Sequence, residues 1–183
     1  QEQINPHFLY NTLEIIVWLA ESGDKEQVIQ VVQSLSRFFR VVLSKGRAVV
    51  SLQEELSCIQ SYLYIQKVRY ADILNYEIQA EPEALDCRIQ KLSLQPLVEN
   101  AVIHGLEPKE EGGTLILDVR KTGNYIRIRI CDNGMGIEKE RLERIRRRLS
   151  EKQPERIGVW NIWQRLSLYT GRDDSLKIMS KKG

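Results

Sequence analysis

Apolar residues recur at helical spacing along the first 70 residues, which predicts three amphipathic helices. The first spans residues 3–22, where apolar positions follow one another at alternating steps of four and three. The second follows the N-cap Asp24 and runs to residue 44, and the third begins at the capping-box pattern Ser51-Leu-Gln-Glu54 and runs to residue 70. Short connections between such helices favour an antiparallel bundle. The three apolar stripes are Ile4, Phe8, Thr12, Ile15 and Leu19; then Val28, Val31, Leu35, Phe38 and Val42; then Leu52, Leu56, Ile59, Leu63 and Gln66.

The pattern changes after residue 70 to a mixture of alternating and helical segments. Alternation predicts strands at 74–80, 115–120, 125–131 and 175–179, with a hairpin turn at 121–124. Helices are expected at 92–106, 138–149 and 159–169, the last capped by Gly171. We therefore expect an α+β chain, with a helical part at residues 1–70, a link at about 70–72 and a second domain at 71–183. Its expected core residues are Leu97, Val98, Ile103, Leu117, Ile128 and Ile130.

The composition narrows the classes of function. The 183 residues carry 27 basic and 25 acidic side chains, which gives no case for direct binding to nucleic acid. Cys58, Cys87 and Cys131 are scattered, which argues against a metal or disulfide framework and fits a reducing cytosol. No apolar run approaches the roughly 20 residues of a membrane span, so we expect a soluble chain.

A first chemical motif lies on the helix predicted at 92–106. Glu99, Asn100 and His104 present oxygen and nitrogen atoms within about one turn. The amide oxygen of Asn100 suits Mg²⁺, which prefers oxygen ligands and keeps several waters. Taken alone, this grouping is more often a solvated helix face or an ordinary helix end.

Two glycine motifs follow. Asp132-Asn-Gly134-Met-Gly136 ends a predicted strand, where glycines allow a ligand to approach the backbone closely. Ile157-Gly158-Val159-Trp160-Asn161 opens a predicted helix, whose free N–H groups and dipole suit phosphate. Each motif alone is usually a plain turn or a helix start.

In this order the three motifs resemble the ATP-binding domain shared by histidine kinases, DNA gyrase, HSP90 chaperones and MutL. They look like its N box and its first and second glycine boxes. The resemblance implies an α/β sandwich with a mixed sheet, helices on one face, and ATP and Mg²⁺ as cofactors. For the first motif it implies that Asn100 binds Mg²⁺, that Glu99 positions water or metal, and that His104 lies near the phosphates. For the second it implies that Asp132 accepts the adenine amino group and that Gly134 and Gly136 shape the adenine pocket. For the third it implies that Gly158 contacts the phosphates and that Asn161 supports the turn.

Residues 137–157 correspond to the mobile ATP lid of this superfamily. They carry Lys139, Arg141, Arg144, Arg146, Arg147 and Arg148. A positive lid over a polyphosphate and an ordinary solvated basic helix are equally open interpretations. Arg156 stands where the second glycine box often has its first glycine, and an arginine does not copy a glycine backbone. This departure concerns the phosphate cradle rather than the domain assignment.

The start of the chain carries a second resemblance. Pro6 favours a helix start, His7 follows it, and Asn11 lies one turn later on the same face. A lone helical histidine is usually a surface or core residue, but this stretch resembles the phosphoacceptor signature of the LytS/YesM group of sensor histidine kinases. The resemblance implies ATP-dependent autophosphorylation of His7 and transfer to an aspartate of a response-regulator receiver domain. For Asn11, an analogy with other kinase families that carry Asn or Thr four residues after the acceptor implies orientation of a water in the reverse, phosphatase reaction.

The same resemblance implies the protein's partners and location. We expect a homodimer through residues 1–70, built as a four-helix bundle, in the cytoplasmic portion of a bacterial membrane sensor. Membrane contact would come only through upstream segments, and the family usually continues with one more C-terminal strand, which we expect to be truncated here. Two alternatives stay open. One is a degenerate nucleotide-binding signalling module, supported by Arg156; the other is an ATPase or serine kinase of the same superfamily, against which the Pro6-His7 signature argues.

Overall fold

The computed structural model describes residues 6–44, 46–70, 73–153 and 158–181. The three expected N-terminal helices are present as α1 (Pro6–Glu21), α2 (Lys25–Val42) and α3 (Leu52–Arg69). The starts of α2 and α3 follow the predicted caps. The Asp24 side chain accepts the Gln27 N–H at 3.0 Å. Ser51 and Glu54 form the capping box through reciprocal bonds of 3.1 and 3.0 Å.

The described residues of the predicted stripes face one another in the core, and Ile4 lies outside the described part of the chain. Phe8 of α1, Phe38 of α2 and Tyr62 of α3 form an aromatic cluster, with the Phe8 ring centroid 5.1 Å from Phe38 and 5.2 Å from Tyr62. Helix α3 is buried over more than one face, because it packs against α2 on one side and against strand β2 (Leu74–Ala80) and helix α4 (Gln95–Asn100) on the other. It therefore joins the α1–α2 hairpin to the rest of the chain. The expected link at 70–72 falls largely on residues 71–72, outside the described part.

A three-stranded mixed sheet forms the second half. Strand β2 runs parallel to β4 (Gly113–Thr122), which pairs antiparallel with β5 (Tyr125–Asp132), so the order is β2-β4-β5. The expected β4–β5 hairpin is confirmed, with Gly123 at a φ of +58° in its turn. A second sheet pairs β1 (Val49–Ser51) with β3 (Arg88–Gln90), and neither strand was predicted. A 3₁₀ turn, η1 (Pro82–Ala84), lies between β2 and β3.

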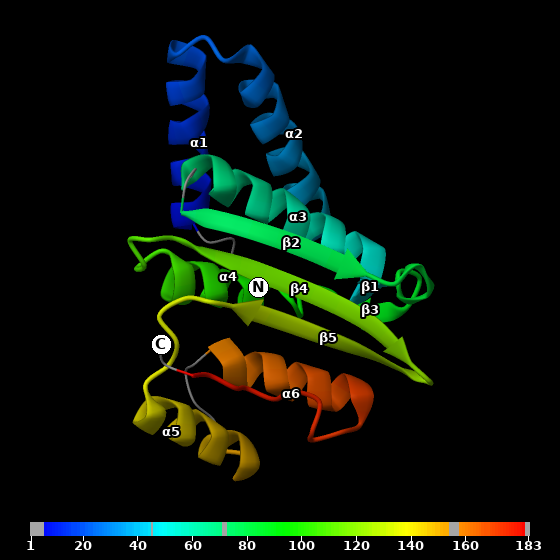
Figure 1. Ribbon diagram of the computed structural model, residues 1–183. Helices are drawn as coiled ribbons and strands as arrows, with labels where there is room; N and C mark the ends of the chain where they lie inside the picture. The colour runs from blue at the N-terminus through cyan, green and yellow to red at the C-terminus, as the bar shows by residue number, and fades with distance from the viewer. Residues whose placement is uncertain (1–5, 45, 71–72, 154–157, 182–183) are drawn as a thin grey trace.

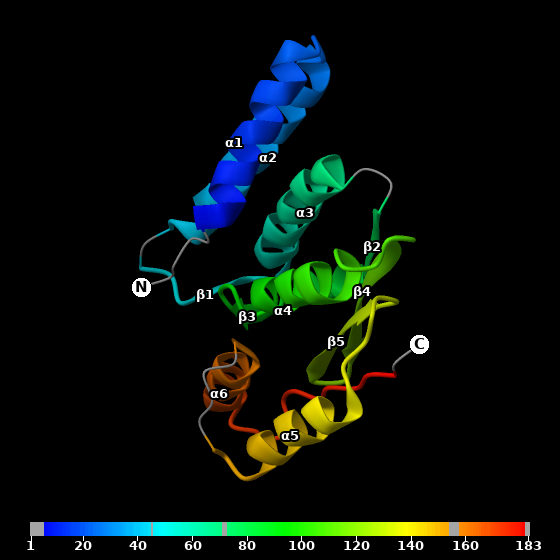
Figure 2. The same ribbon diagram turned by 90° about the vertical axis from the view of Figure 1, so that its left-hand side faces the viewer.

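Helices cover one face of the sheet, as expected. Helix α4 continues into a π-helix, η2 (Ala101–Leu106), and is followed after the sheet by α5 (Lys139–Ser150) and α6 (Gly158–Thr170). Figure 2 shows α3, α4 and α6 on the same side of the sheet. In Figures 1 and 2 the α1–α2 hairpin and the α5–α6 pair lie at opposite ends of the molecule. Within the described ranges, no helix is long and apolar enough to cross a membrane.

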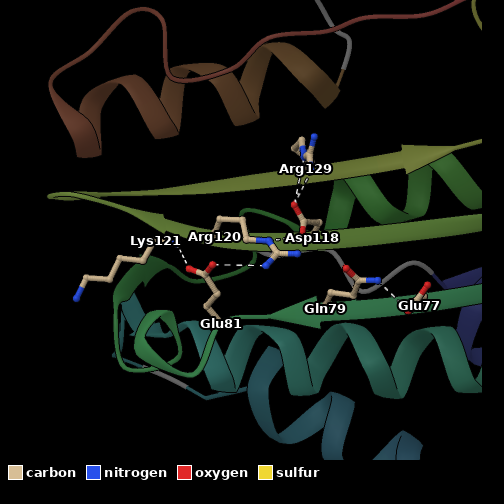
Figure 3. Close-up of polar contacts among 7 residues, drawn as sticks. All are labelled: Glu77, Gln79, Glu81, Asp118, Arg120, Lys121 and Arg129. Carbon is tan, nitrogen blue, oxygen red and sulfur yellow. Dashed lines mark hydrogen bonds and ion pairs between the residues drawn. The ribbon is translucent and has the colours of Figure 1, made fainter.

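The other face of the sheet carries a network of polar and charged side chains (Figure 3). Its centre is Asp118, whose two carboxylate oxygens accept Arg120 Nε at 2.8 Å and Arg129 Nη2 at 2.9 Å. The bonds from Arg129 hold the pKa of Asp118 below its ordinary value. At the end of β2, Glu81 accepts the backbone N–H of Lys121 at 2.7 Å. These paired charges favour contact with water, which explains why the helices gather on the opposite face.

Of the expected core residues, Val98 and Leu117 are buried, whereas Leu97, Ile103, Ile128 and Ile130 are half-buried. The helix expected from residue 92 begins at Gln95, because Leu92 adopts a left-handed φ of +54°.

The prediction of a strand at 175–179 was wrong, because these residues are described and belong to no sheet. They bond to other elements instead. The Ile178 carbonyl accepts the Arg146 guanidinium at 2.8 and 3.0 Å, and Ser180 Oγ accepts the Ile137 N–H at 2.8 Å.

Candidate functional site

The first motif occupies the junction of α4 and η2. Glu99 and Asn100 end α4 and are half-buried, whereas His104 is exposed on η2. Gln95 Nε2 donates to Glu99 Oε1 at 3.0 Å, and burial raises the pKa of the Glu99 carboxyl. The widened turn is visible in the Glu107 N–H, which reaches back five residues to the Val102 carbonyl at 2.8 Å. Short π-helices occur frequently at functional sites.

The first glycine motif packs directly on this π-helix. The Met135 N–H donates to the Gly105 carbonyl at 2.9 Å, and Asp132 Oδ1 accepts the Gly134 N–H at 3.0 Å. A Cβ at Gly134 would lie 2.1 Å from Gly105 O, and one at Gly105 would lie 2.8 Å from Asp132 Oδ1. Gly136 has a φ of +69°, which favours glycine. Both motifs therefore meet through positions that leave no room for a side chain.

Two further residues hold this turn, and the sequence analysis missed them. Asn133 Oδ1 accepts the Thr114 N–H at 2.7 Å, so the turn is anchored to the start of β4. Lys109 Nζ donates to the Asn133 carbonyl at 3.0 Å. Asparagine commonly bonds to nearby backbone in turns, which was an available signal for Asn133. Nothing in the sequence marked Lys109, because its partner lies across a long-range contact.

The second glycine motif opens α6. Gly158 is exposed, and a Cβ there would meet nothing within 4 Å. The first-turn N–H groups of a helix lack intrahelical partners and attract anions. Asn161 is exposed one turn later, while Trp160 and Trp163 are buried with ring centroids 4.8 Å apart. These tryptophans turn α6 toward the core, where it packs against α4. Arg156 and Ile157 lie outside the described residues.

Helix α5 occupies the expected lid. Leu142 and Ile145 are buried and fasten one side of the helix. Its arginines mostly face outward, although Arg146 bonds to the Ile178 carbonyl. Both a phosphate-facing lid and a solvated basic helix are compatible with this arrangement, so the lid stays a prediction.

The candidate phosphoacceptor lies in the first turn of α1. His7 is exposed, and Asn11 Nδ2 lies 3.2 Å from its Nδ1 and 3.3 Å from its Nε2. Phe8 points into the aromatic cluster, which orients the first turn and directs His7 outward. The structure does not bring α1 to α5 and α6, since these elements lie at opposite ends (Figure 1).

The described residues carry groups that a nucleotide and its magnesium ion would need. Asp132 is exposed, and besides the oxygen that accepts the Gly134 N–H its carboxylate has further lone pairs for an amino group. Within the described part of the chain, no three His, Cys, Asp or Glu side chains gather around a metal position. A magnesium ion at Asn100 would thus take most of its ligands from phosphates and water, which is its common binding mode.

Comparison with known proteins covers both parts of the chain. Residues 1–74 match the family model described as histidine kinase. Residues 90–172 match the model described as histidine kinase-, DNA gyrase B-, and HSP90-like ATPase. A solved histidine kinase domain of the blue-light activated histidine kinase from Erythrobacter litoralis EL346 aligns over 74% of each chain at 13% identity. Its TM-score of 0.35 is too low to inform the fold.

Curated relatives align with nearly the whole length of the chain. The chain is 37% identical to the sensor histidine kinase YesM of Bacillus subtilis over 99% of its length and 30% of the relative. It is 36% identical to the sensor protein LytS of Oceanobacillus iheyensis, covering 98% of this chain and 31% of the relative. For the sensor protein kinase HptS of Staphylococcus aureus the identity is 32%, over 100% and 35%. The chain thus spans about a third of the length of these relatives. On both its halves, the chain belongs to the sensor histidine kinases of the LytS and YesM type.

Proposed function

We propose that this chain is the ATP- and Mg²⁺-dependent transferase part of a two-component sensor, which phosphorylates His7 and passes the phosphoryl group to an aspartate on a response-regulator receiver domain. The observation that carries the proposal is the contact of the Asp132–Gly136 turn with the π-helix at Gly105, in a chain whose first helix opens with an exposed His7. Family membership supports a kinase.

Binding of the nucleotide would divide among three elements. Asp132 would accept the adenine amino group, and Gly134 and Gly136 would shape the pocket for the base. The first-turn N–H groups of α6, beginning at Gly158, would bind phosphate oxygens. Asn100 would hold Mg²⁺, which neutralises phosphate charge when it is bound. Glu99, His104 and Asn161 would line the same region.

His7 would supply the nucleophile. A neutral imidazole has one nitrogen with a free lone pair, and this nitrogen would attack the γ-phosphorus in line. The N–P bond forms as the bond from that phosphorus to the ADP oxygen breaks. The aspartate of the regulator then attacks the same phosphorus and releases the imidazole. Asn11, within 3.2 Å of the ring, would position the imidazole or a water for dephosphorylation.

Transfer requires the acceptor and the nucleotide to meet. The α1–α2 hairpin and the α5–α6 pair lie at opposite ends of the molecule (Figures 1 and 2). Either the catalytic part swings toward its own α1, or it reaches the α1 of a second copy. Both routes agree with a dimer.

An unpartnered apolar face supports that dimer. Tyr10, Leu13, Val17 and Trp18 share one side of α1 and are 65, 47, 56 and 65% exposed. They lie away from the stripe that packs on α2 and α3, so α1 is apolar on two sides. A helix of this kind is normally buried on both. We infer that residues 1–70 pair with a second copy as a four-helix bundle. Membrane attachment and the sensing part of the whole protein would belong to upstream segments.

The test is incubation of the chain with γ-labelled ATP and Mg²⁺. We expect an acid-labile label on the wild type and on the remote variant Lys121→Met, and none on His7→Gln or Asn100→Asp. Binding of Mg-ATP without labelling would instead indicate the degenerate signalling module. An acid-stable label on serine would indicate a serine kinase. A label retained in His7→Gln would refute the assignment of the acceptor.

A further inference from the structure

The segment that precedes α4 forms hydrogen bonds to four other elements, namely β1, α2, α3 and α6. Residues 88–94 comprise β3 and the loop that leads into α4, the helix that carries Glu99 and Asn100. The Lys91 N–H donates to the Ala48 carbonyl at 3.0 Å, which extends the pairing of β3 with β1. Its remaining bonds run to α2, α3 and α6.

The first tie runs from Lys91 to the end of α2. The Lys91 residue is 4% exposed, and its Nζ donates to the carbonyls of Val42 and Ser44, both at 2.9 Å. The last carbonyls of a helix lack intrahelical partners and lie at the negative end of its dipole. A buried ammonium also requires such acceptors, because an unpaired one is very costly. The carbonyls at the end of α2 therefore need a donor, the Lys91 ammonium needs acceptors, and each satisfies the other.

The second tie runs from the same residue to α6. Arg165 Nη2 donates to the Lys91 carbonyl at 2.6 Å, and the Tyr169 hydroxyl donates to the Arg88 carbonyl at 3.3 Å. Both side chains belong to α6, whose first residue is Gly158. Lys91 thus contacts the hairpin through its side chain and α6 through its backbone.

The third tie fixes the conformation of the loop. The Glu55 side chain of α3 is buried, and its carboxylate accepts the N–H groups of Leu92 at 2.8 Å and Leu94 at 3.0 Å. Leu92 has a φ of +54°, which is uncommon for a residue with a side chain and persists only where the surroundings enforce it. A loop held this tightly transmits displacement rather than absorbing it.

We propose that Lys91 and Arg165 are positioning residues that couple the end of α2 to α4 and α6, so that the placement of the α1–α2 hairpin sets the relative positions of Asn100 and Gly158. This inference rests on the proposed function and deepens it. A shift of the end of α2 moves the buried ammonium, because an ammonium that stayed behind would lose both acceptors, and an unpaired buried charge is very costly. The shift reaches α4 along the chain and reaches α6 through Arg165.

The kinetic test compares Lys91→Met, Lys91→Arg and Arg165→Met with the exposed-lysine control Lys121→Met. Methionine keeps much of the apolar stem but removes the donors. We expect Lys91→Met and Arg165→Met to lower kcat for autophosphorylation by about 10- to 100-fold, since misplacement of about an ångström has effects of that size. The KM for ATP should change less than kcat, because each element that contacts the nucleotide stays folded and only the relative positions of these elements change. Lys91→Arg should recover most of the rate, since a guanidinium also donates to both carbonyls.

A purely structural role for Lys91 gives a different result. It would lower the fraction of chains that bind Mg-ATP and leave kcat per bound nucleotide unchanged. That outcome, or a wild-type kcat in both methionine variants, would overturn the proposal. The coupling is tested separately at Lys91 and at Arg165, so if one variant fails to fold, the other still tests the proposal.

A distance measurement separates this inference from the proposed function. Spin labels at Gln33→Cys on α2 and Gln164→Cys on α6 lie on exposed positions, in a background with Cys87→Ser and Cys131→Ser. Dilution with unlabelled chain isolates the distance within one copy. We expect Lys91→Met to broaden the α2–α6 distance distribution and Lys121→Met to leave it narrow. An unchanged width refutes the coupling even if the kinase is active, and a broadened width supports it even if the wild type is not.

Discussion

The contact between Gly134 and Gly105 allows a quantitative test of the candidate nucleotide site. In Gly134→Ala the added methyl would lie 2.1 Å from Gly105 O and 2.3 Å from Gly105 C, so the turn and the π-helix must separate. Overpacking of this kind costs about 1–3 kcal/mol. Loss of the 2.9 Å bond from Met135 N to Gly105 O adds about 1 kcal/mol. For a chain of this size, each kcal/mol lowers Tm by about 2–4 °C. We therefore expect a fall in Tm on the order of 4–16 °C.

Nucleotide affinity should fall with stability, because the same separation moves Asp132 away from the π-helix. A penalty of about 1.4 kcal/mol on the bound geometry raises the Kd tenfold, so we expect a rise of about 10-fold or more in the Kd for Mg-ATP. Isothermal titration below the Tm of both proteins measures this change. Gly158→Ala is the matched control for stability, since its methyl meets nothing within 4 Å and its Tm should stay near the wild-type value. A wild-type Tm and Kd in Gly134→Ala would show that the two motifs do not pack as described.

Three other variants test separate features. Trp18→Glu should raise the dimer dissociation constant by about 10-fold or more, because it places a charge in an apolar interface; sedimentation measures this, with the 80% exposed Leu168→Glu on α6 as a control expected to have no effect. Asn11→Ala should slow dephosphorylation of the regulator while His7 still accepts phosphate, and an unchanged rate would contradict the role given to Asn11. For Asp118 the folded-state pKa is lowered, so its stabilising effect is present above the ordinary carboxyl pKa and is lost as pH falls through the lowered value. Urea unfolding should therefore find Asp118→Asn less stable than wild type at neutral pH and equally stable in strong acid; a gap that persists in acid would exclude the ion pairs as its cause.

Local signals explain the parts of the fold that the sequence predicted well. Helices α1 to α3 appeared within a few residues of their expected bounds, because helical periodicity and the caps at Asp24 and Ser51 act over one or two turns. The β4–β5 hairpin was also predicted correctly, because hydrophobic and polar residues alternate along its strands and a two-residue turn with Gly123 joins them. The motif residues of the candidate site were named from the sequence, and their roles stay predictions.

Contacts between distant segments decided the rest. Strands β1 and β3 are three residues long, which is too short to show an alternating hydrophobic pattern. They form because they pair with each other, although they lie far apart in the sequence. Hydrophobic and polar residues alternate over 175–179 as in a strand. The Ile178 carbonyl, however, accepts a hydrogen bond from the Arg146 side chain and not from a neighbouring strand. The π-helix and the left-handed Leu92 likewise depend on partners that no local pattern names, namely the glycine turn at Gly134 and the Glu55 carboxylate. The sequence by itself determined which segments form helices and hairpins, because those bonds close over a few residues. Only the tertiary structure decided which surfaces meet. Buried backbone N–H and C=O groups must find hydrogen-bond partners, and at these positions the partners lie in distant segments of the chain.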